Sequence, residues 1–180
     1  NGENETGVTT FKLKHEIDTG DILLQQSFAI GENETAGEVH DRMKLIGAEL
    51  LVKTVVELAD NTLTEIPQSL TISEIKHAPK IFTETCKIDF SKSVEDVHNL
   101  IRGLSPFPGA FTYVNDKLLK IYRSEMELTD INKTNGTLLS DDKTFVKFAC
   151  SNGYIKVLEL QLEGKKRMKI DDFLKGNKLL

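Results

Sequence analysis

The chain has 180 residues, of which 39% are hydrophobic, enough for one domain or two small ones and too many for a disordered chain. Its net charge of −5 at pH 7 argues against a protein that coats nucleic acid with its whole surface. No apolar run approaches the roughly 20 residues that span a membrane, and the start, Asn-Gly-Glu-Asn-Glu, is unlike a signal peptide.

The charge is divided unevenly along the chain. Residues 1–85 carry 7 basic and 15 acidic side chains, a net of −8, whereas residues 86–180 carry 16 and 13, a net of +3. This asymmetry indicates two units with different partners, and a polyanion approaches the second unit first. The two cysteines, Cys86 and Cys150, lie far apart in no metal-ligand spacing, which favours free thiols in the cytoplasm over a disulfide.

The first predicted elements are two strands, at residues 7–13 and 22–30, joined by the polar loop His-Glu-Ile-Asp-Thr-Gly-Asp at residues 15–21. A polar connection on a rigid pair of strands is a usual place for chemistry. The loop offers carboxylates, an imidazole and a glycine that can take conformations other residues avoid. On composition alone, a charged hairpin loop without chemistry remains the alternative.

A long amphipathic helix is predicted at residues 36–59. Thr35 and Glu38 have the spacing of a capping box, and the apolar positions that follow at helical spacing are Val39, Met43, Ile46, Leu50, Val55 and Leu58. Charged residues are expected on the other face. Two strands and one helix cannot bury both faces of a sheet, and the chain starts at Asn rather than Met. We therefore expect the first unit to be a piece of a larger domain. It is expected to pack on residues 86–180, to pair with another copy, or to be seen without the rest of its domain.

Residues 63–92 are predicted to be a linker between a first unit at 1–62 and a second at 93–180, because Pro, Ser and Thr interrupt them without a sustained period. Within this linker, Ile81-Phe82 and Ile88-Asp89-Phe90 are expected to dock as short extended pieces.

The second unit begins with a helix at residues 94–104, capped by Ser93, and Pro106 and Pro108 then impose a stiff turn. After this the apolar period changes to two. Strands are predicted at 110–114, 118–122, 125–128, 136–139, 144–150 and 154–160, and a short helix at 170–174. Short strands at regular spacing indicate a small barrel or sandwich.

Three stretches together resemble the 10-formyltetrahydrofolate-dependent formyltransferase family. They are Ile-Asp-Thr-Gly-Asp-Ile at 17–22, preceded by Glu-Thr-Gly-Val-Thr at 5–9, then Leu-Ser-Pro-Phe-Pro-Gly-Ala-Phe at 104–111, and Leu-Glu-Leu-Gln-Leu-Glu-Gly-Lys-Lys-Arg-Met at 158–168. Each alone is weak, but their order and spacing cover nearly the whole chain. The resemblance implies an α+β chain of two units, the tail of an α/β, Rossmann-like formyltransferase domain followed by an OB-like β-barrel domain.

The resemblance also implies an activity, namely formyl transfer from 10-formyltetrahydrofolate to the amino group of methionyl initiator tRNA in translation initiation, in the cytoplasm and without a metal. The family uses an Asn, a His and an Asp, and the Asp corresponds to Asp18. A carboxylate beside the catalytic imidazole favours its protonated form and can order a proton-relaying water. The backbone around it would line the pterin end of the folate, at His15, Glu16, Ile17, Thr19 and Gly20. The chain holds no Asn-x-His pair, so these residues alone are expected to be inactive.

The densest basic run is the predicted tRNA contact: Lys165, Lys166, Arg167 and Lys169. Lys and Arg contact phosphates without sequence preference, and a solubilising turn is the alternative. Lys117, Lys120 and Arg123 extend the run only if the barrel places them on the same side. The alternating aromatic residues of the strands, Phe111, Tyr113 and Tyr122, are expected to be mainly core, with base stacking as the alternative.

The remaining ionisable residues suggest no further site. His40, His77 and His98 are scattered singly and are expected at the surface or its boundary rather than on a metal, and Asp21 is expected to be a solvated acid or local cap.

Three other functions stay open. A sugar-nucleotide N-formyltransferase and a formyltetrahydrofolate hydrolase/dehydrogenase domain share the Asp loop, and a non-enzymatic OB-type nucleic-acid-binding module needs no loop chemistry. The positive charge of residues 86–180 and the Gly-Lys-Lys-Arg-Met stretch favour tRNA. The resemblance implies a monomeric enzyme, whereas the incomplete first unit alone is expected to self-associate.

Overall fold

The computed structural model describes residues 1–68 and 76–179, and the chain divides into two compact units. The N-terminal unit comprises Glu3–Glu32 and Glu38–Lys80. The C-terminal unit comprises Asn1–Gly2, Asn33–Gly37 and Ile81–Leu180. Each unit is described by itself.

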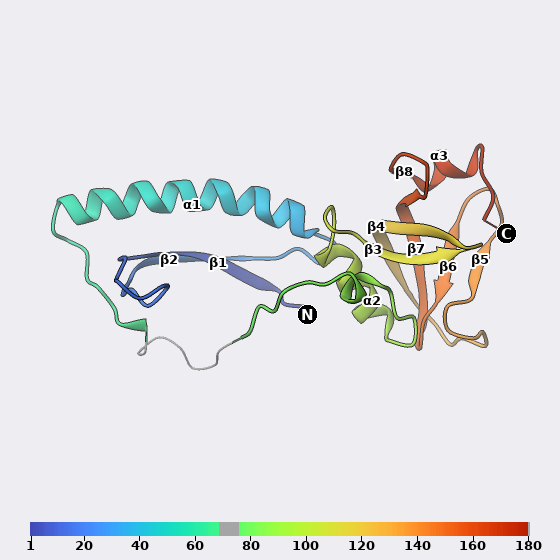
Figure 1. The fold of residues 1–180 in the computed structure, drawn as a ribbon, viewed down its shortest axis with the longest axis horizontal. Helices are drawn as coiled ribbons and strands as arrows, with labels where there is room; N and C mark the ends of the chain where they lie inside the picture. Colours follow the sequence, from blue (N-terminus) through green and yellow to red (C-terminus); the bar gives the residue numbers. More distant parts are fainter. Residues whose placement is uncertain (69–75, 180) are drawn as a thin grey trace. The chain divides into compact units, whose positions relative to one another are not determined.

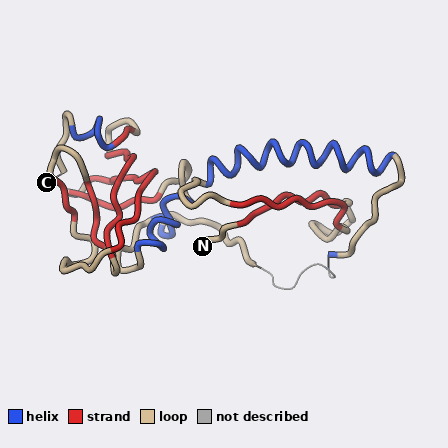
Figure 2. Tube along the Cα trace, turned by 180° about the vertical axis from the view of Figure 1, so that it is seen from behind, coloured by secondary structure: helices blue, strands red, loops and turns tan. Residues whose placement is uncertain are grey.

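The N-terminal unit is built on an antiparallel hairpin of β1 (Glu5–Phe11) and β2 (Ile22–Ala29). Helix α1 (Ala36–Ala59) runs alongside this hairpin in Figure 1, and Figure 2 shows the same arrangement from behind. The predicted helix and pair of strands are confirmed, with strand ends shifted by one or two residues.

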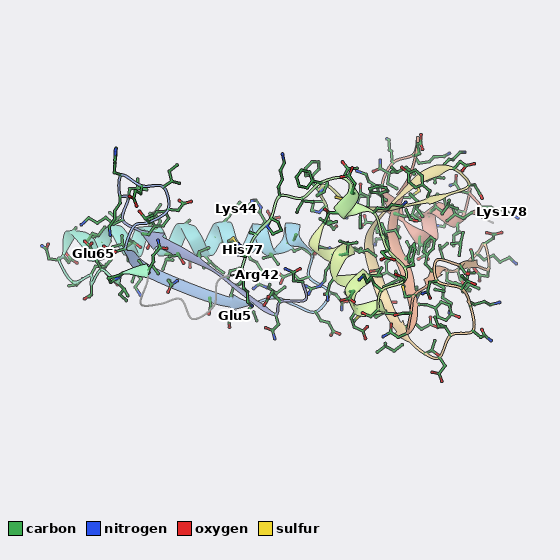
Figure 3. All side chains as sticks on the ribbon, turned by 60° about the horizontal axis from the view of Figure 1, so that its bottom comes forward. Glu5, Arg42, Lys44, Glu65, His77 and Lys178 are labelled. Carbon is green, nitrogen blue, oxygen red and sulfur yellow. The ribbon has the colours of Figure 1, made fainter. Side chains whose placement is uncertain are left out.

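Polar contacts fix α1 on the hairpin at both of its ends. Near its end, the hydroxyl of the buried Thr54 lies 2.9 Å from that of Thr10 on β1. Near its start, Arg42 (labelled in Figure 3) donates to the carbonyl of Ala29 at 2.8 Å, and its guanidinium lies 4.7 Å from the ring centre of Phe28. The bond to Thr10 satisfies the hydroxyl that Thr54 buries, whereas Arg42 stays exposed.

The other face of α1 is apolar and exposed, which corrects the amphipathic prediction. Leu50 is buried as expected, but Val55 is 58% exposed and Leu58 is also exposed. The reason is the helical period, which brings Thr54 and Glu57 to the hairpin after Leu50. The outward face of α1 carries Leu45, Leu51, Val52, Val55, Val56 and Leu58. Among the described residues no helix combines the length and apolar composition that crossing a bilayer requires.

The C-terminal unit is a curled antiparallel sheet (Figure 1). In the described residues the strand order is β3-β4-β7-β6-β5, with β8 paired to β7. The strands are β3 (Ala110–Val114), β4 (Lys117–Leu128), β5 (Leu138–Ser140), β6 (Val146–Ala149), β7 (Gly153–Leu162) and β8 (Met168–Lys169). Asn115 and Asp116 form the β3–β4 turn with positive φ angles of 50° and 60°, as the sequence predicts for a tight hairpin.

Helix α2 (Val94–Gly103) packs its apolar face on this sheet. Ser93 caps it by accepting a hydrogen bond from the amide of Asp96 at 3.1 Å. Val94, Val97 and Ile101 are buried with the sheet residues Leu119, Ile121, Ile155 and Leu160. Helix α3 (Ile170–Leu174) closes one end through the fully buried Phe173.

The end of the predicted linker belongs to this core. A short 3-10 helix, η2 (Glu84–Cys86), is followed by Ile88, whose amide donates to the carbonyl of Phe111 at 2.8 Å, and by Phe90, stacked on Phe148. Ile88 and Phe90 therefore dock as predicted, whereas Ile81 and Phe82 remain half exposed. The expected strands 118–122 and 125–128 are one strand, β4, because register shifts between Ile121 and Ser124 interrupt its alternation without ending it.

Candidate functional site

The loop between β1 and β2 is closed by backbone hydrogen bonds rather than left loose. The amide of Lys12 donates to the carbonyl of Asp21 at 3.0 Å, directly beyond the paired strands. Ile22 and Ile66 exchange two backbone hydrogen bonds of 2.8 and 2.9 Å, which add a third segment beside the hairpin. An ion pair of 2.6 Å joins Lys12 to Glu65, which Figure 3 labels. These contacts fix both ends of the loop that carries the predicted site.

Gly20 is required by this closure. It is the buried residue of the loop, and a Cβ built on it would lie 1.6 Å from the carbonyl oxygen of Lys12. No side chain fits at that distance, so the close approach of the two loop ends depends on glycine.

Gln68 holds the tip of the loop. Its side-chain amide donates to the carbonyl of Asp18 at 2.9 Å and to that of Gly20 at 2.7 Å. Asp18 has a left-handed backbone with φ of 57°, and the Thr19 hydroxyl donates to the carbonyl of Glu16 at 3.1 Å. Asp tolerates the left-handed conformation better than most side chains do, so this residue suits the tip of a tight loop. Sequence reasoning missed Gln68 because nothing in the linker pattern distinguishes it.

The carboxylate of Asp18 is exposed and makes no hydrogen bond or ion pair with any described residue. It is thereby available to a ligand or to a second protein group. Asp21, in contrast, is only partly exposed and pairs with Lys14 at 2.8 Å, so its carboxylate braces the loop. His15, Glu16 and Ile17 form an exposed rim on the same loop. All six predicted residues of 15–20 lie together, and five of them face solvent while Gly20 has a structural role.

The second predicted site, the basic run, is divided by the structure. Arg167 makes a bidentate ion pair with Glu159 at 2.8 and 2.7 Å, and its guanidinium lies 4.3 Å from the ring centre of Tyr122. Hydrogen bonding to Glu159 raises the pKa of Arg167, and Arg167 lowers the pKa of Glu159. Its charge is therefore largely neutralised within the fold.

The lysines of the run are free of such partners. The side chains of Lys165, Lys166 and Lys169 are exposed and make no hydrogen bond or ion pair with residues in the described part of the chain. Arg123 lies on the same side of the sheet, since Glu159 is 3.8 Å from it as well. Lys120 donates to the carbonyl of Pro108 at 2.9 Å.

His98 corrects one expectation. It is buried, and its Nδ1 lies 2.9 Å from the hydroxyl of the buried Ser124, so it belongs to the core rather than to the surface or its boundary. Its place on the inward face of α2 decides this.

Cys86 and Cys150 are both free and buried, and burial raises the pKa of the Cys150 thiol to about 11. No group of three potential metal ligands occurs in the described residues.

Comparison with known proteins identifies a family. The family described as formyl transferase, C-terminal domain, matches residues 80–178, and the one described as formyl transferase matches residues 1–55. The methionyl-tRNA formyltransferase of Azobacteroides pseudotrichonymphae is 44% identical over 100% of this chain and 58% of its own length. That of Phocaeicola vulgatus is 42% identical over 98% and 57%. The chain thus spans less than two thirds of these relatives.

Solved structures share the fold. HypX from Aquifex aeolicus has a TM-score of 0.70 at 19% identity, covering 98% of this chain and 32% of its own. The N-formyltransferase from Helicobacter canadensis, in complex with folinic acid and dTDP-3-aminofucose, has a TM-score of 0.66 at 23% identity, covering 92% and 57%.

Substituting Gly20→Ala is expected to destabilise the N-terminal unit by roughly 1–3 kcal/mol, because the added Cβ forces the carbonyl of Lys12 away. Gly47→Ala in α1 is the matched control, because a Cβ there lies 3.8 Å from Val8, an ordinary van der Waals contact. It is expected to leave the free energy of unfolding unchanged or to raise it by up to about 1 kcal/mol, since alanine favours a helix more than glycine does. Urea unfolding followed by far-UV circular dichroism measures both. Equal stability of the two variants would contradict the role given to Gly20.

Proposed function

The chain belongs to the formyl transferase family, and from this premise we propose that it is a methionyl-tRNA formyltransferase chain, acting on 10-formyltetrahydrofolate and methionyl initiator tRNA. The observation that carries the proposal is the braced loop with the exposed carboxylate of Asp18 at its left-handed tip, which makes no ion pair or hydrogen bond within residues 1–68 and 76–179. This loop lies in the region that matches the formyl transferase family, residues 1–55.

Asp18 is proposed as the catalytic residue of this chain. In formyl transfer an amine attacks the formyl carbon, and protons leave the amine and reach the folate nitrogen. A free carboxylate at the reaction centre can hold an imidazole in its protonated form or order a water that relays protons. The hydrogen bond from Gln68 holds the backbone that carries Asp18 and leaves both carboxylate oxygens available, because Gln68 bonds the backbone carbonyl.

The loop also fits a folate. 10-Formyltetrahydrofolate would supply the formyl group itself, and the Helicobacter canadensis relative was solved with the related folinic acid. The exposed rim offers Ile17 as an apolar surface for the pterin, and His15, Glu16 and Thr19 as polar groups beside it. Gly20 contributes by letting the loop close.

The C-terminal unit is proposed to bind tRNA. Residues 86–180 carry a net charge of +3, and after β7 the side chains of Lys165, Lys166 and Lys169 are exposed and make no hydrogen bond or ion pair with described residues. Arg167 contributes to this proposed surface by fixing the turn through its ion pair with Glu159. We describe the curled antiparallel sheet with its covering helix α2 as OB-like, a fold class that often binds nucleic acid.

The proposed division assigns residues 1–62 to the end of a catalytic domain and 93–180 to the tRNA-binding domain, joined by 63–92, of which the end with Ile88 and Phe90 belongs to the C-terminal core. The two family matches, at 1–55 and 80–178, support this order. The exposed apolar side chains on the outer face of α1 support it too, because a large exposed apolar patch is normally covered by a larger domain or a partner. Since the reaction serves translation initiation, we place it in the cytoplasm.

A sugar-nucleotide N-formyltransferase is the second candidate. It is supported by the fold shared with the Helicobacter canadensis enzyme, at 23% identity. The sequence relatives at 42–44% identity are named methionyl-tRNA formyltransferase, which favours tRNA.

Joined to the stretch of the Azobacteroides relative that it does not span, the chain is expected to formylate methionyl initiator tRNA with 10-formyltetrahydrofolate. Asp18→Asn should lower kcat/KM by about 10²-fold or more, as loss of a proton-transfer group does. Asp21→Asn is the matched control, expected within about fivefold because it removes only a partly exposed ion pair. A folded enzyme that formylates only a dTDP-amino sugar, or that keeps full activity with Asp18→Asn, contradicts the proposal.

Binding of initiator tRNA to the chain should weaken steeply as salt increases. Replacing Lys165, Lys166 and Lys169 by Gln is expected to flatten the slope of log affinity against log salt by about 2–3, because each lost phosphate contact removes nearly one unit. Arg167→Gln should flatten the slope by less than about one unit, since Glu159 already neutralises its charge. Fluorescence anisotropy titrations at salt concentrations of about 50 to 300 mM measure the slopes of both variants. If the affinity of the unchanged chain does not depend on salt, the proposed tRNA surface is wrong.

A further inference from the structure

An aromatic groove lies in the C-terminal unit, away from the loop of residues 15–20. Its volume is about 600 Å³, within the usual range for ligand pockets. One wall is formed by Ile81, Phe82, Thr83 and Cys86 and the other by the β3–β4 hairpin, with Phe107 and Pro108 of the Pro-Phe-Pro turn at its end. No Asp or Glu is among the described residues that line it, and Lys120 is its charged residue.

Three aromatic rings stand exposed at this groove. Phe107 is 86% exposed, Phe82 56% and Tyr113 55%. Exposed aromatic rings gathered at one place mark an interaction site more often than isolated ones do. Pro106 and Pro108 restrict the backbone on both sides of Phe107, and the ring of Tyr113 lies edge-on to that of Phe111 at 5.8 Å.

The groove and the basic run share one face of the sheet. Residues directly paired across antiparallel strands point to the same side, and Phe111 pairs with Lys120, which pairs with Gln161. The side chain of Gln161 then donates to the carbonyl of Lys165 at 3.0 Å. Phe111 on β3 and Gln161 on β7 are separated by two strand spacings, about 10 Å. The aromatic rings of the groove and the lysines after β7 are therefore close enough for a few nucleotides of a single RNA chain to contact both.

We propose that this groove binds an unpaired base of an RNA strand, stacked on Phe107 and Tyr113, while Lys165 and Lys166 contact its phosphates. The proposal rests on the proposed function in so far as tRNA is the RNA. A base offers a flat ring for the aromatic walls and is attached to negative charge, which suits a groove whose described lining includes Lys120 and no acid, beside the exposed Lys165 and Lys166. An apolar peptide would use the rings but not the neighbouring lysines.

The test compares two fluorescently labelled RNA octamers of equal charge, octauridine and an octamer of abasic ribose phosphates, binding to the unmodified 180-residue chain. Octauridine is expected to bind roughly tenfold more tightly than the abasic octamer, because stacking of one base on an aromatic ring contributes about that much affinity. Phe107→Ala should bring the two affinities together, and Tyr113→Ala should reduce their ratio. Leu128→Ala, which removes another exposed apolar side chain of β4, should leave the ratio unchanged. Lys165→Gln with Lys166→Gln should weaken both octamers equally.

Circular dichroism verifies folding of each variant, and Phe107 is exposed enough for its removal to leave the core intact. Equal affinity for the two octamers, no binding of either, or a ratio that survives Phe107→Ala overturns the proposal. So does a decaproline peptide that binds the groove where octauridine does not. Formylation of methionyl initiator tRNA by the joined enzyme separates the two hypotheses. If formylation occurs while the octamers bind equally, the base site fails and the proposed function stands.

Discussion

The structure of the candidate site depends on one steric constraint, the close approach of the two ends of the β1–β2 loop at Gly20. The carbonyl of Lys12 occupies the space where any other residue would carry its Cβ. Because the loop closes there, Asp21 can bond Lys12 through the backbone, and Gln68 can reach two carbonyls of the tip. The left-handed conformation of Asp18 follows from this arrangement, and its carboxylate remains exposed.

The C-terminal unit uses charge in two different ways. Arg167 is paired with Glu159 and covered by Tyr122, so it fixes the turn, whereas the neighbouring lysines keep their charge for a partner. Arg suits the first role because its planar group bonds both carboxylate oxygens at once. The same face continues across β7 and β4 to the aromatic groove, so charge and exposed rings form one surface with a chemistry that suits a single RNA strand.

Much of the local structure could be predicted from the sequence. Helix α1 covers the predicted residues 36–59, for which the capping-box spacing and the long apolar period agree, and strand β3 covers the predicted residues 110–114. Contacts between distant residues could not be predicted. The pairing of Arg167 with Glu159, the clamp from Gln68 and the burial of His98 all depend on strand register and helix rotation, which a single sequence does not encode locally.

We propose that the hydrogen bonds from Gln68, and not the loop sequence alone, position Asp18 for catalysis. The most direct measurement is kcat/KM for formylation by the joined enzyme carrying Gln68→Met, which removes both hydrogen bonds and keeps the length of the side chain. The account predicts a loss of about tenfold or more in kcat/KM, as misplacement of a catalytic group causes, with unchanged affinity for initiator tRNA and unchanged global stability. Unaltered kcat/KM in a folded Gln68→Met enzyme would contradict it.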